Sequence, residues 1–309
     1  MESFAGKLAI VTGGGSGMGR ELVIKLAAAG CSVAACDLDR HSLAQTGRLA
    51  AARASGPARL SVHECDVSDE AALLRFRDEA LAAHGPGGQA GADSVDHVDL
   101  VFANAGIGGG GSLIADPREH WERVFAVNFW GVYCTVRTFL PLLIKSPDGV
   151  LVNTSSVNGF WASLGPGVPH TAYSTSKFAV KGLTESLIED LRVNAPHVRV
   201  VLVMPGHIGT DIVGNSLRAF GADDAEIIEQ ANAGFRDTAP TTAAQAVTII
   251  LDGVRSGAWR VLVGPDAETL DELVRARPED AYDYEELAMR RAAWEAGGEG
   301  QAAGETEAS

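Results

Sequence analysis

This chain has little of what three common classes of protein require. Its 309 residues include only 4 cysteines, and no apolar run approaches the ~18 residues that span a membrane. Lysine and arginine together number 25 against 40 aspartates and glutamates, so the net charge is -15. A disulfide framework, a membrane span and a basic surface for nucleic acid are therefore not expected.

The cysteines and histidines give no sign of a metal site. Neither the 8 histidines nor the 4 cysteines show the spacing of metal ligands. The cysteines lie in or beside apolar segments, and we expect them to be reduced core residues: Cys31, Cys36, Cys65 and Cys134. Residues 1–7 lack the features of a signal peptide, so a soluble, cytoplasmic protein is expected.

Much of the negative charge lies at the C-terminal end. Residues 265–309 hold thirteen acids and four bases, which account for -9 of the -15. This composition predicts an acidic C-terminal extension that is partly disordered, with one helix near 285–295. A solvated tail and an extension that covers a partner are the two interpretations.

Short β-branched runs alternate with longer helix-like segments along most of the chain. The strand-like runs are 8–11, 32–36, 60–64, 100–103, 149–154, 199–204 and 260–263, and the helix-like segments are 18–29, 41–54, 69–83, 117–145, 173–194 and 242–256. Several strands are too uniformly apolar to have a wet face. The pattern predicts an α/β fold of the Rossmann type, a doubly wound parallel sheet with helices on both faces. A glycine-rich segment at 85–97 is expected to be an enlarged surface loop.

A glycine-rich turn follows the first strand, from Thr12 to Gly19. Its glycines permit a tight turn and let backbone N–H groups approach a pyrophosphate at the start of the next helix. The spacing is GxxxGxG, which differs from the commoner GxGxxG. The predicted cofactor-binding residues of this turn are Gly13, Ser16, Gly17, Met18 and Gly19.

Further cofactor contacts are expected after the second, third and fourth strands. Asp37 ends the second strand, where a carboxylate accepts both adenosine ribose hydroxyls and repels a 2′-phosphate, which favours NAD over NADP. Asp37 as a helix cap is the alternative, and Arg40 nearby could accommodate NADP. The remaining predicted contacts are Asp66 and Val67 after the third strand, and Asn104, Ala105 and Gly106 after the fourth.

Tyr173 and Lys177 stand four residues apart in a helix-like segment. On a helix they share one face, where an ammonium group lowers the pKa of a neighbouring phenol toward neutrality. Such a pair suits proton transfer in alcohol and carbonyl chemistry. Taken alone, it is also typical of a solvated helix face.

In their order, these motifs resemble those of the single-domain short-chain dehydrogenase/reductase family over roughly residues 5–264. Residues 1–264 would form the catalytic domain. The resemblance implies a seven-stranded sheet and a catalytic tetrad of Asn128, Ser156, Tyr173 and Lys177. Ser156 is preferred to Ser155 because the family uses the second serine of Ser-Ser-x-x-Gly. The resemblance also implies cofactor contacts from Tyr173 and Lys177 and, after the sixth strand, from Pro205, Gly206, Ile208 and Thr210.

The family's chemistry gives each of these residues an expected role. Tyr173 would act as acid and base, Lys177 would lower its pKa and bind the nicotinamide ribose, and Ser156 would position the substrate oxygen. Asn128 would help to hold a water that relays protons. Thr210 would hold the nicotinamide carboxamide.

The substrate pocket is expected to come from less regular segments. Residues 211–240 resemble the family's helical substrate lid, and an unusually long gap after Ser156 leaves an insertion at 164–170 that would alter the pocket wall. Phe160, Trp161 and His207 are further candidates, although aromatic residues after a strand are typical of a core.

The expected function is an NAD-dependent oxidoreductase that interconverts a bulky, apolar secondary alcohol and its ketone. One alternative is an NADP-linked 3-oxoacyl reductase. Another is a nucleotide-sensing protein without redox turnover. The resemblance further implies a homodimer or homotetramer, assembled through the helices that carry Asn128 and Tyr173.

Overall fold

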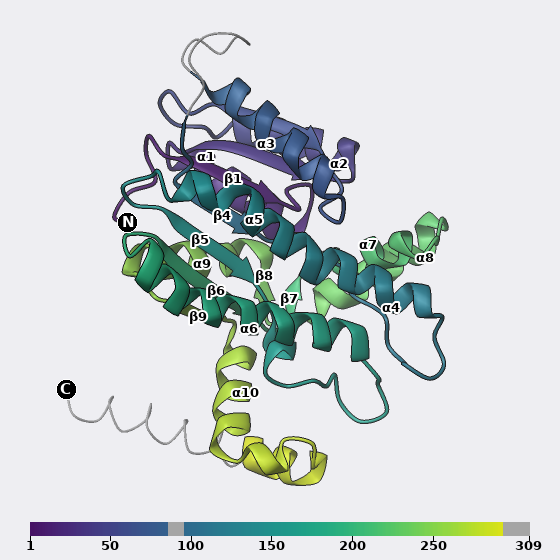
Figure 1. The fold of residues 1–309 in the computed structure, drawn as a ribbon. Helices are drawn as coiled ribbons and strands as arrows, with labels where there is room; N and C mark the ends of the chain where they lie inside the picture. Colours follow the sequence, from purple (N-terminus) through teal and green to yellow (C-terminus); the bar gives the residue numbers. More distant parts are fainter. Residues whose placement is uncertain (86–95, 293–309) are drawn as a thin grey trace, which may run out of the picture.

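A computed structural model describes residues 1–85 and 96–292, in which seven parallel strands form one sheet in the order β3-β2-β1-β4-β5-β6-β9 (Figure 1). The strands are β1 (Leu8–Thr12), β2 (Ser32–Asp37), β3 (Leu60–Glu64), β4 (Leu100–Ala103), β5 (Val150–Thr154), β6 (Arg199–Pro205) and β9 (Arg260–Val263). All seven strands match predicted runs, and the doubly wound fold is confirmed. Two short segments, β7 (Ile208–Gly209) and β8 (Thr241–Thr242), form a separate pair that was not predicted.

Helices cover both faces of the sheet, which explains why its central strands β1, β4 and β5 are buried on both sides. In β1, Ala9 and Val11 pack with one core cluster, whereas Leu8 and Ile10 pack with the other. The first cluster is covered by α1 (Gly17–Ala28), α2 (Arg40–Ala51) and α9 (Ala243–Ser256), and the second by α3 (Glu70–His84), α5 (Gly131–Leu143) and α6 (Thr171–Asn194). Over residues 1–85 and 96–292, none of the helices has both the length and the apolar character to cross a membrane.

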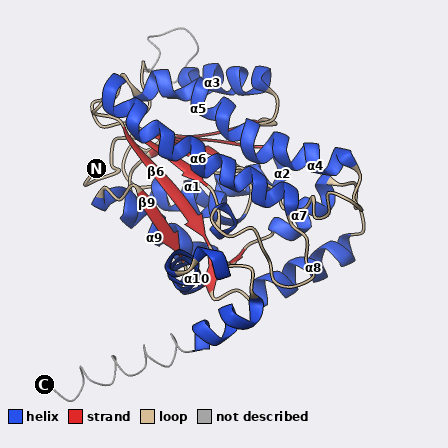
Figure 2. Ribbon diagram, turned by 60° about the horizontal axis from the view of Figure 1, so that its bottom comes forward, coloured by secondary structure: helices blue, strands red, loops and turns tan. Residues whose placement is uncertain are grey.

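Two helices project beyond the sheet at one end of the molecule. They are α7 (Ile212–Ala219) and α8 (Ala225–Asp237), and Figures 1 and 2 place them at the same end as α4 (Arg118–Phe125). They occupy the segment predicted to resemble a lid. The Gly214 backbone N–H donates a 2.7 Å hydrogen bond to the Asn232 side-chain oxygen, and this bond joins the two helices.

The predicted long helix at 117–145 contains an irregularity. Between α4 and α5 lies a π-helical turn, Ala126–Trp130. A π turn fits an extra residue into a helix and changes the direction of the side chains, and such turns are frequent at functional sites. Here it turns Val127 and Asn128 inward, so that Asn128 is completely buried.

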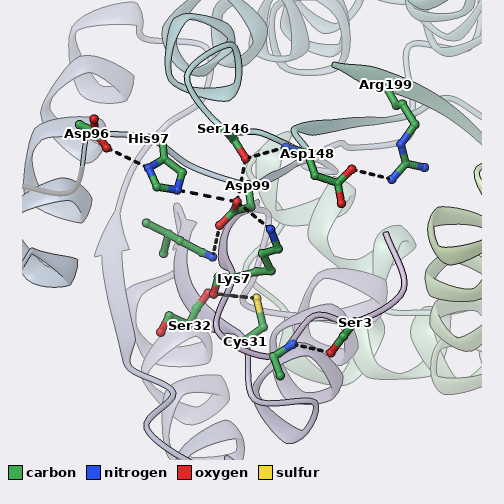
Figure 3. Close-up of polar contacts among 12 residues, drawn as sticks. Ser3, Lys7, Cys31, Ser32, Asp96, His97, Asp99, Ser146, Asp148 and Arg199 are labelled. Atoms are coloured by element: carbon green, nitrogen blue, oxygen red, sulfur yellow. Dashed lines mark hydrogen bonds and ion pairs between the residues drawn. The ribbon is translucent and has the colours of Figure 1, made fainter. Parts of the chain in front are cut away.

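A buried aspartate organises the edge of the sheet at which the strands begin. Figure 3 shows Asp99, just before β4, surrounded by donors. Its carboxylate accepts hydrogen bonds from the Leu8 backbone (2.9 Å), the Ser146 hydroxyl (2.7 Å) and the Lys7 ammonium (3.3 Å). These bonds join β1, β4 and the approach to β5 at the amino ends of the strands. The carboxyl ends of the strands, where parallel sheets bind ligands, remain available.

The C-terminal extension is folded as far as residue 292. It contains α10 (Pro265–Ala276), a 3₁₀ turn (Pro278–Asp280) and a helix over 284–292, and Figure 1 shows α10 leading away from the β9 side of the sheet. The interpretation of 265–309 as a solvated tail is wrong for 265–292, because Leu273 and Leu287 are buried and Asp271 pairs with Arg260. The predicted disorder at 293–309 and most of the predicted 85–97 loop lie outside the described residues.

Candidate active site

The glycine-rich turn is built so tightly that it excludes side chains at several positions. Gly13 and Gly17 adopt left-handed backbone conformations, with φ of 70° and 51°. A Cβ on Gly13 would lie 2.8 Å from the Ala105 Cα, and a Cβ on Gly19 would overlap the Gly13 carbonyl oxygen. The turn therefore brings the N-terminus of α1 close to the ends of β1 and β4, where backbone N–H groups can bind an anion.

A cavity of about 430 Å³ opens beside this turn. Most of the predicted cofactor-binding residues line it: Gly13, Ser16, Gly17, Met18, Gly19, Asp37, Asp66, Val67, Asn104, Ala105, Gly106 and Thr210. It is also lined by residues that were not predicted, Arg123 on α4 and Asn215 and Arg218 on α7. Asn215 donates a 2.9 Å hydrogen bond to the Ser16 hydroxyl, which links α7 to the glycine-rich turn.

Asp37 lies against the glycine-rich turn and does not cap a helix. Its carboxylate accepts hydrogen bonds from the backbone N–H groups of Gly15 (2.8 Å) and Asp39 (2.9 Å). The cap of α2 is Asp39, whose side chain accepts from His41 and Ser42. The alternative of Asp37 as a helix cap is therefore wrong. Burial raises the pKa of Asp37 above its ordinary value, against the effect of these hydrogen bonds.

Asp66 and Asn104 are held by neighbouring residues at the edge of the same cavity. Although burial acts to raise the pKa of Asp66, hydrogen bonds from Ser68 and Arg123 outweigh it and lower that pKa. The Asn104 side-chain nitrogen donates to the Thr12 carbonyl at 3.1 Å, while its Oδ1 is buried without a partner in the described chain. Asn104 thus ties the end of β4 to the end of β1 and leaves one acceptor atom available.

Asn128 and Lys177 meet behind Gly106. The Asn128 side chain forms two 2.8 Å hydrogen bonds with the backbone of Ile107, one as donor and one as acceptor. The Lys177 ammonium donates to the Thr154 carbonyl at 3.0 Å. A Cβ on Gly106 would lie 3.2 Å from Asn128 Oδ1 and 3.4 Å from Lys177 Nζ, so the three positions converge on one small space.

The two adjacent serines have different surroundings. The Ser155 hydroxyl is buried and donates to the Lys177 carbonyl at 2.8 Å, which fixes β5 to α6. Ser156 borders a second cavity together with Tyr173, and its hydroxyl accepts a 3.1 Å hydrogen bond from the Asn158 backbone. Ser156 is therefore the serine that a ligand could reach beside Tyr173.

The pKa of Tyr173 differs from the expectation based on sequence. Burial raises it above its ordinary value, and a hydrogen bond with Ser156 only partly opposes this effect. The Lys177 ammonium lies 5.5 Å from the centre of the Tyr173 ring, and burial lowers the pKa of Lys177 to about 8. In this structure burial is the larger influence on the Tyr173 pKa, and the predicted lowering of that pKa is not found.

The second cavity has a volume of about 680 Å³ and joins the first, since Met18, Thr210 and Ile212 line both. Of the residues predicted for cofactor or substrate, it is lined by Ser156, Trp161, Tyr173, Pro205, Gly206, His207, Ile208 and Thr210. Leu164 and His170 bring the predicted 164–170 insertion into its wall. Phe160 is absent from the lining, and its ring lies 5.8 Å from the guanidinium of Arg260.

His170 adds an uncharged ring to this wall. Its ring centre lies 4.6 Å from that of Tyr173, and burial lowers the pKa of His170 to about 4. The imidazole is therefore neutral at neutral pH. Around Tyr173 the cavity is predominantly apolar, with contributions from Val157, Val213, Leu217 and Phe220.

The buried Lys177 predicts a specific pH dependence of stability. Its pKa is about 8 in the folded protein against the ordinary 10.5, so between these values the unfolded state binds more protons and stability rises with pH. Lys177→Met removes this effect. Above pH 8, we expect the free energy of unfolding of the wild type to rise relative to that of the variant by about 1 kcal/mol per pH unit. Urea unfolding of both proteins at pH 7 and near pH 10 measures it, and a constant difference would contradict the assignment.

A parallel sheet with a glycine-lined cavity at its carboxyl edge is the architecture of dinucleotide-binding proteins. The family model described as short chain dehydrogenase matches residues 7–219. The chain belongs to this family of oxidoreductases, as its resemblance predicted.

Individual relatives are similar to this chain over most of its length. An oxidoreductase named SadH from Mycobacterium tuberculosis is 36% identical over 275 residues, which cover 89% of this chain and 92% of the relative. The (3R)-3-hydroxyacyl-CoA dehydrogenase of Mus musculus is 33% identical over 208 residues, which cover 66% of this chain and 74% of the relative. A solved short chain dehydrogenase/reductase from Burkholderia phymatum, in complex with NAD, has a TM-score of 0.75 and 31% identity over 91% of this chain and 95% of its own.

Proposed function

We propose that this protein is an NAD-dependent oxidoreductase that interconverts a bulky, apolar secondary alcohol and its ketone, with Tyr173 as the acid and base. The observation that carries the proposal is the junction of the two cavities. Ser156 and Tyr173 border the apolar cavity, and Met18 and Thr210 connect it to the glycine-lined one. A substrate oxygen at Tyr173 would therefore lie close to a nicotinamide that enters from the other side.

The residues of the glycine-lined cavity fit a dinucleotide. Gly13 and Gly19 let the turn close tightly, so that backbone N–H groups at the N-terminus of α1 can bind a pyrophosphate, and Asp37 can accept ribose hydroxyls. The buried Asn104 Oδ1 offers a further acceptor. When bound, NAD accepts a hydride at its nicotinamide ring, and NADH supplies one. The neighbour from Burkholderia phymatum, in complex with NAD, supports this cofactor.

Within this proposal, the side chains move a proton and hold the substrate oxygen. Because burial raises the pKa of Tyr173, its phenol is protonated at neutral pH, and that form donates a proton to a ketone oxygen. Ser156 hydrogen-bonds the same oxygen and fixes its position. Lys177 and Asn128 lie behind the site, where Lys177 can contact the nicotinamide ribose and pass a proton toward solvent.

The choice of NAD over NADP rests on Asp37 and gives a direct prediction. Asp37→Ser removes the carboxylate, so we expect the preference for NADH over NADPH to fall by about tenfold or more, through the loss of charge-assisted hydrogen bonds. The matched control is Asp69→Ser, which removes an acid from the cap of α3 and keeps a capping hydroxyl. Turnover with the two reduced cofactors measures the ratio. An unchanged ratio in Asp37→Ser would reject this role.

A second candidate substrate class is the 3-oxoacyl thioester, because the mouse relative is named a (3R)-3-hydroxyacyl-CoA dehydrogenase. Asp37 argues against the NADP-linked form of this activity. Assaying acetoacetyl-CoA beside cyclic and branched ketones separates the two classes. If NADH binds but no substrate of either class reacts, a nucleotide-sensing protein becomes the better account.

We also propose that the protein is a homodimer or homotetramer. Large apolar side chains are exposed on the two helices implicated in assembly: Trp130 at the π turn and Tyr133 on α5 are 50% and 37% exposed, and Phe178 on α6 is 41% exposed. Burial of these side chains in a second copy would stabilise an assembly. Mass measurement in solution, with Trp130→Glu as the disrupting variant, tests this assembly.

A further inference from the structure

The outer wall of the apolar cavity comes from the C-terminal extension. Leu270 and Leu273 on α10, and Leu287 on the following helix, all line the cavity that contains Ser156 and Tyr173. Leu273 and Leu287 are 6% and 8% exposed. The family model ends at residue 219, so these residues belong to a part of the chain that the model does not describe.

The extension is joined to the segment that follows Ser156 by three consecutive hydrogen bonds. Trp161 Nε1 donates to the Ala281 carbonyl at 2.6 Å, and the Ala162 backbone donates to the Tyr282 hydroxyl at 3.1 Å. The Ser163 and Tyr284 hydroxyls are 2.8 Å apart. Residues 120 positions apart in sequence therefore form one continuous wall.

The start of α10 is fixed to the sheet at the same edge. The Asp266 carboxylate accepts a 2.6 Å hydrogen bond from the His207 backbone, and a Cβ on Gly206 would overlap it. Further along α10, Asp271 accepts hydrogen bonds from Arg260 on β9 at 2.9 Å and from Arg275 at 2.9 Å. Burial acts to raise the pKa of Asp271, but these bonds outweigh it and lower that pKa. The extension is thus anchored at both ends of its contact with the cavity.

We propose that residues 265–292 cover the substrate cavity and set the size of the ligand, with Leu270, Leu273 and Leu287 as specificity-determining residues. The proposal rests on the proposed function and names its substrate class. The ligand is a free, compact apolar alcohol or ketone of drug-like size, packed between Tyr173 and α10. Trp161 lines the same cavity and is hydrogen-bonded to Ala281, so the extension also fixes this side of the cavity.

A cavity-filling variant tests the proposal in the full-length protein. Leu273→Trp narrows the cavity from the side of α10, whereas Val274→Ala is the matched control, since Val274 is equally buried on the same helix but does not line the cavity. The probes are cyclohexanone, 2-decalone and a 3-ketosteroid. We expect Leu273→Trp to lower kcat/KM at least about tenfold for the largest ketone and to spare cyclohexanone, because steric exclusion depends on ligand size.

The control variant should change kcat/KM equally for all three ketones. Equal effects of Leu273→Trp on large and small ketones would overturn the proposal. Binding of the 3-ketosteroid in the presence of NADH, measured by calorimetry, tests the cavity assignment separately from the proposed function. If no ketone is reduced but the wild type binds the steroid and Leu273→Trp does not, the proposed chemistry fails and the cavity assignment stands. If the wild type and Leu273→Trp bind it equally, or neither binds it, the cavity assignment fails.

Discussion

Replacing Tyr173 by phenylalanine is expected to lower kcat by roughly 10²- to 10⁴-fold, the usual contribution of a general acid and base. The change removes only the hydroxyl, and the ring can keep its contact with His170. In the proposed mechanism the phenol donates its proton to the ketone oxygen, so the substitution removes the proton donor at that position. Ketone-dependent oxidation of NADH, followed by absorbance, measures the loss.

The control for this substitution is Tyr133→Phe, which removes a hydroxyl from α5 at a tyrosine that lines neither cavity. It should leave turnover unchanged. NADH binding should be nearly the same in both variants, because Tyr173 borders the apolar cavity and is not among the residues that line the glycine-lined one. Wild-type turnover in Tyr173→Phe would show that the proton comes from elsewhere.

Gly19→Ala is expected to weaken cofactor binding strongly. Its methyl group would overlap the Gly13 carbonyl oxygen, so the turn must open, at a cost of about 3 kcal/mol or more. Such a cost corresponds to a loss of roughly a hundredfold in NADH affinity. Fluorescence titration with NADH measures the affinity, and urea unfolding shows how much of the cost falls on stability.

The matched control is Gly234→Ala on α8, where an added Cβ meets nothing within 4 Å. Alanine is a better helix former than glycine, so this variant should bind NADH normally and unfold with a free energy higher by about 0.5–1 kcal/mol. If Gly19→Ala bound NADH as tightly as the wild type, the turn could not be the pyrophosphate site.

Much of the fold could be predicted because local patterns and tertiary structure agree. The central strands β1, β4, β5 and β6 are buried on both faces, so their sequences are mostly apolar, and the helices between them leave few alternative topologies. The turn from Thr12 to Gly19 could be located because only glycine fits at positions 13 and 19. Asp37 was placed correctly at the end of β2, but the choice between a ligand contact and a helix cap needed the structure, which assigns the cap to Asp39.

The net charge of residues 265–292 suggests a solvated tail and obscures a short apolar pattern that is typical of a packed helix. Leu270, Leu273 and Val274 are spaced as on one face of a helix, and this spacing could have revealed α10. The acids of α10 fall largely on its other faces, while Asp271 is buried in its ion pairs. A pattern of three residues says nothing about the distant surface against which it packs.

The features around the site that escaped prediction depend on contacts between distant segments. No sequence pattern indicates that the helix at Asn128 forms a π turn, or that Arg123, Asn215 and Arg218 reach the cofactor cavity. The pKa of Tyr173 is a further case. The spacing to Lys177 predicts a lowered pKa, but the burial that raises the pKa exists only in the fold.

The central claim is that this protein transfers a hydride between a nicotinamide and a secondary alcohol carbon at Tyr173. The most direct test is to incubate the protein with 2-decalone and NADH deuterated at C4 of the nicotinamide, and to examine the alcohol by mass spectrometry and NMR. We predict deuterium on the carbinol carbon in the wild type and almost none with Tyr173→Phe over the same time. Alcohol formed without deuterium from either prochiral form of the cofactor would contradict the account.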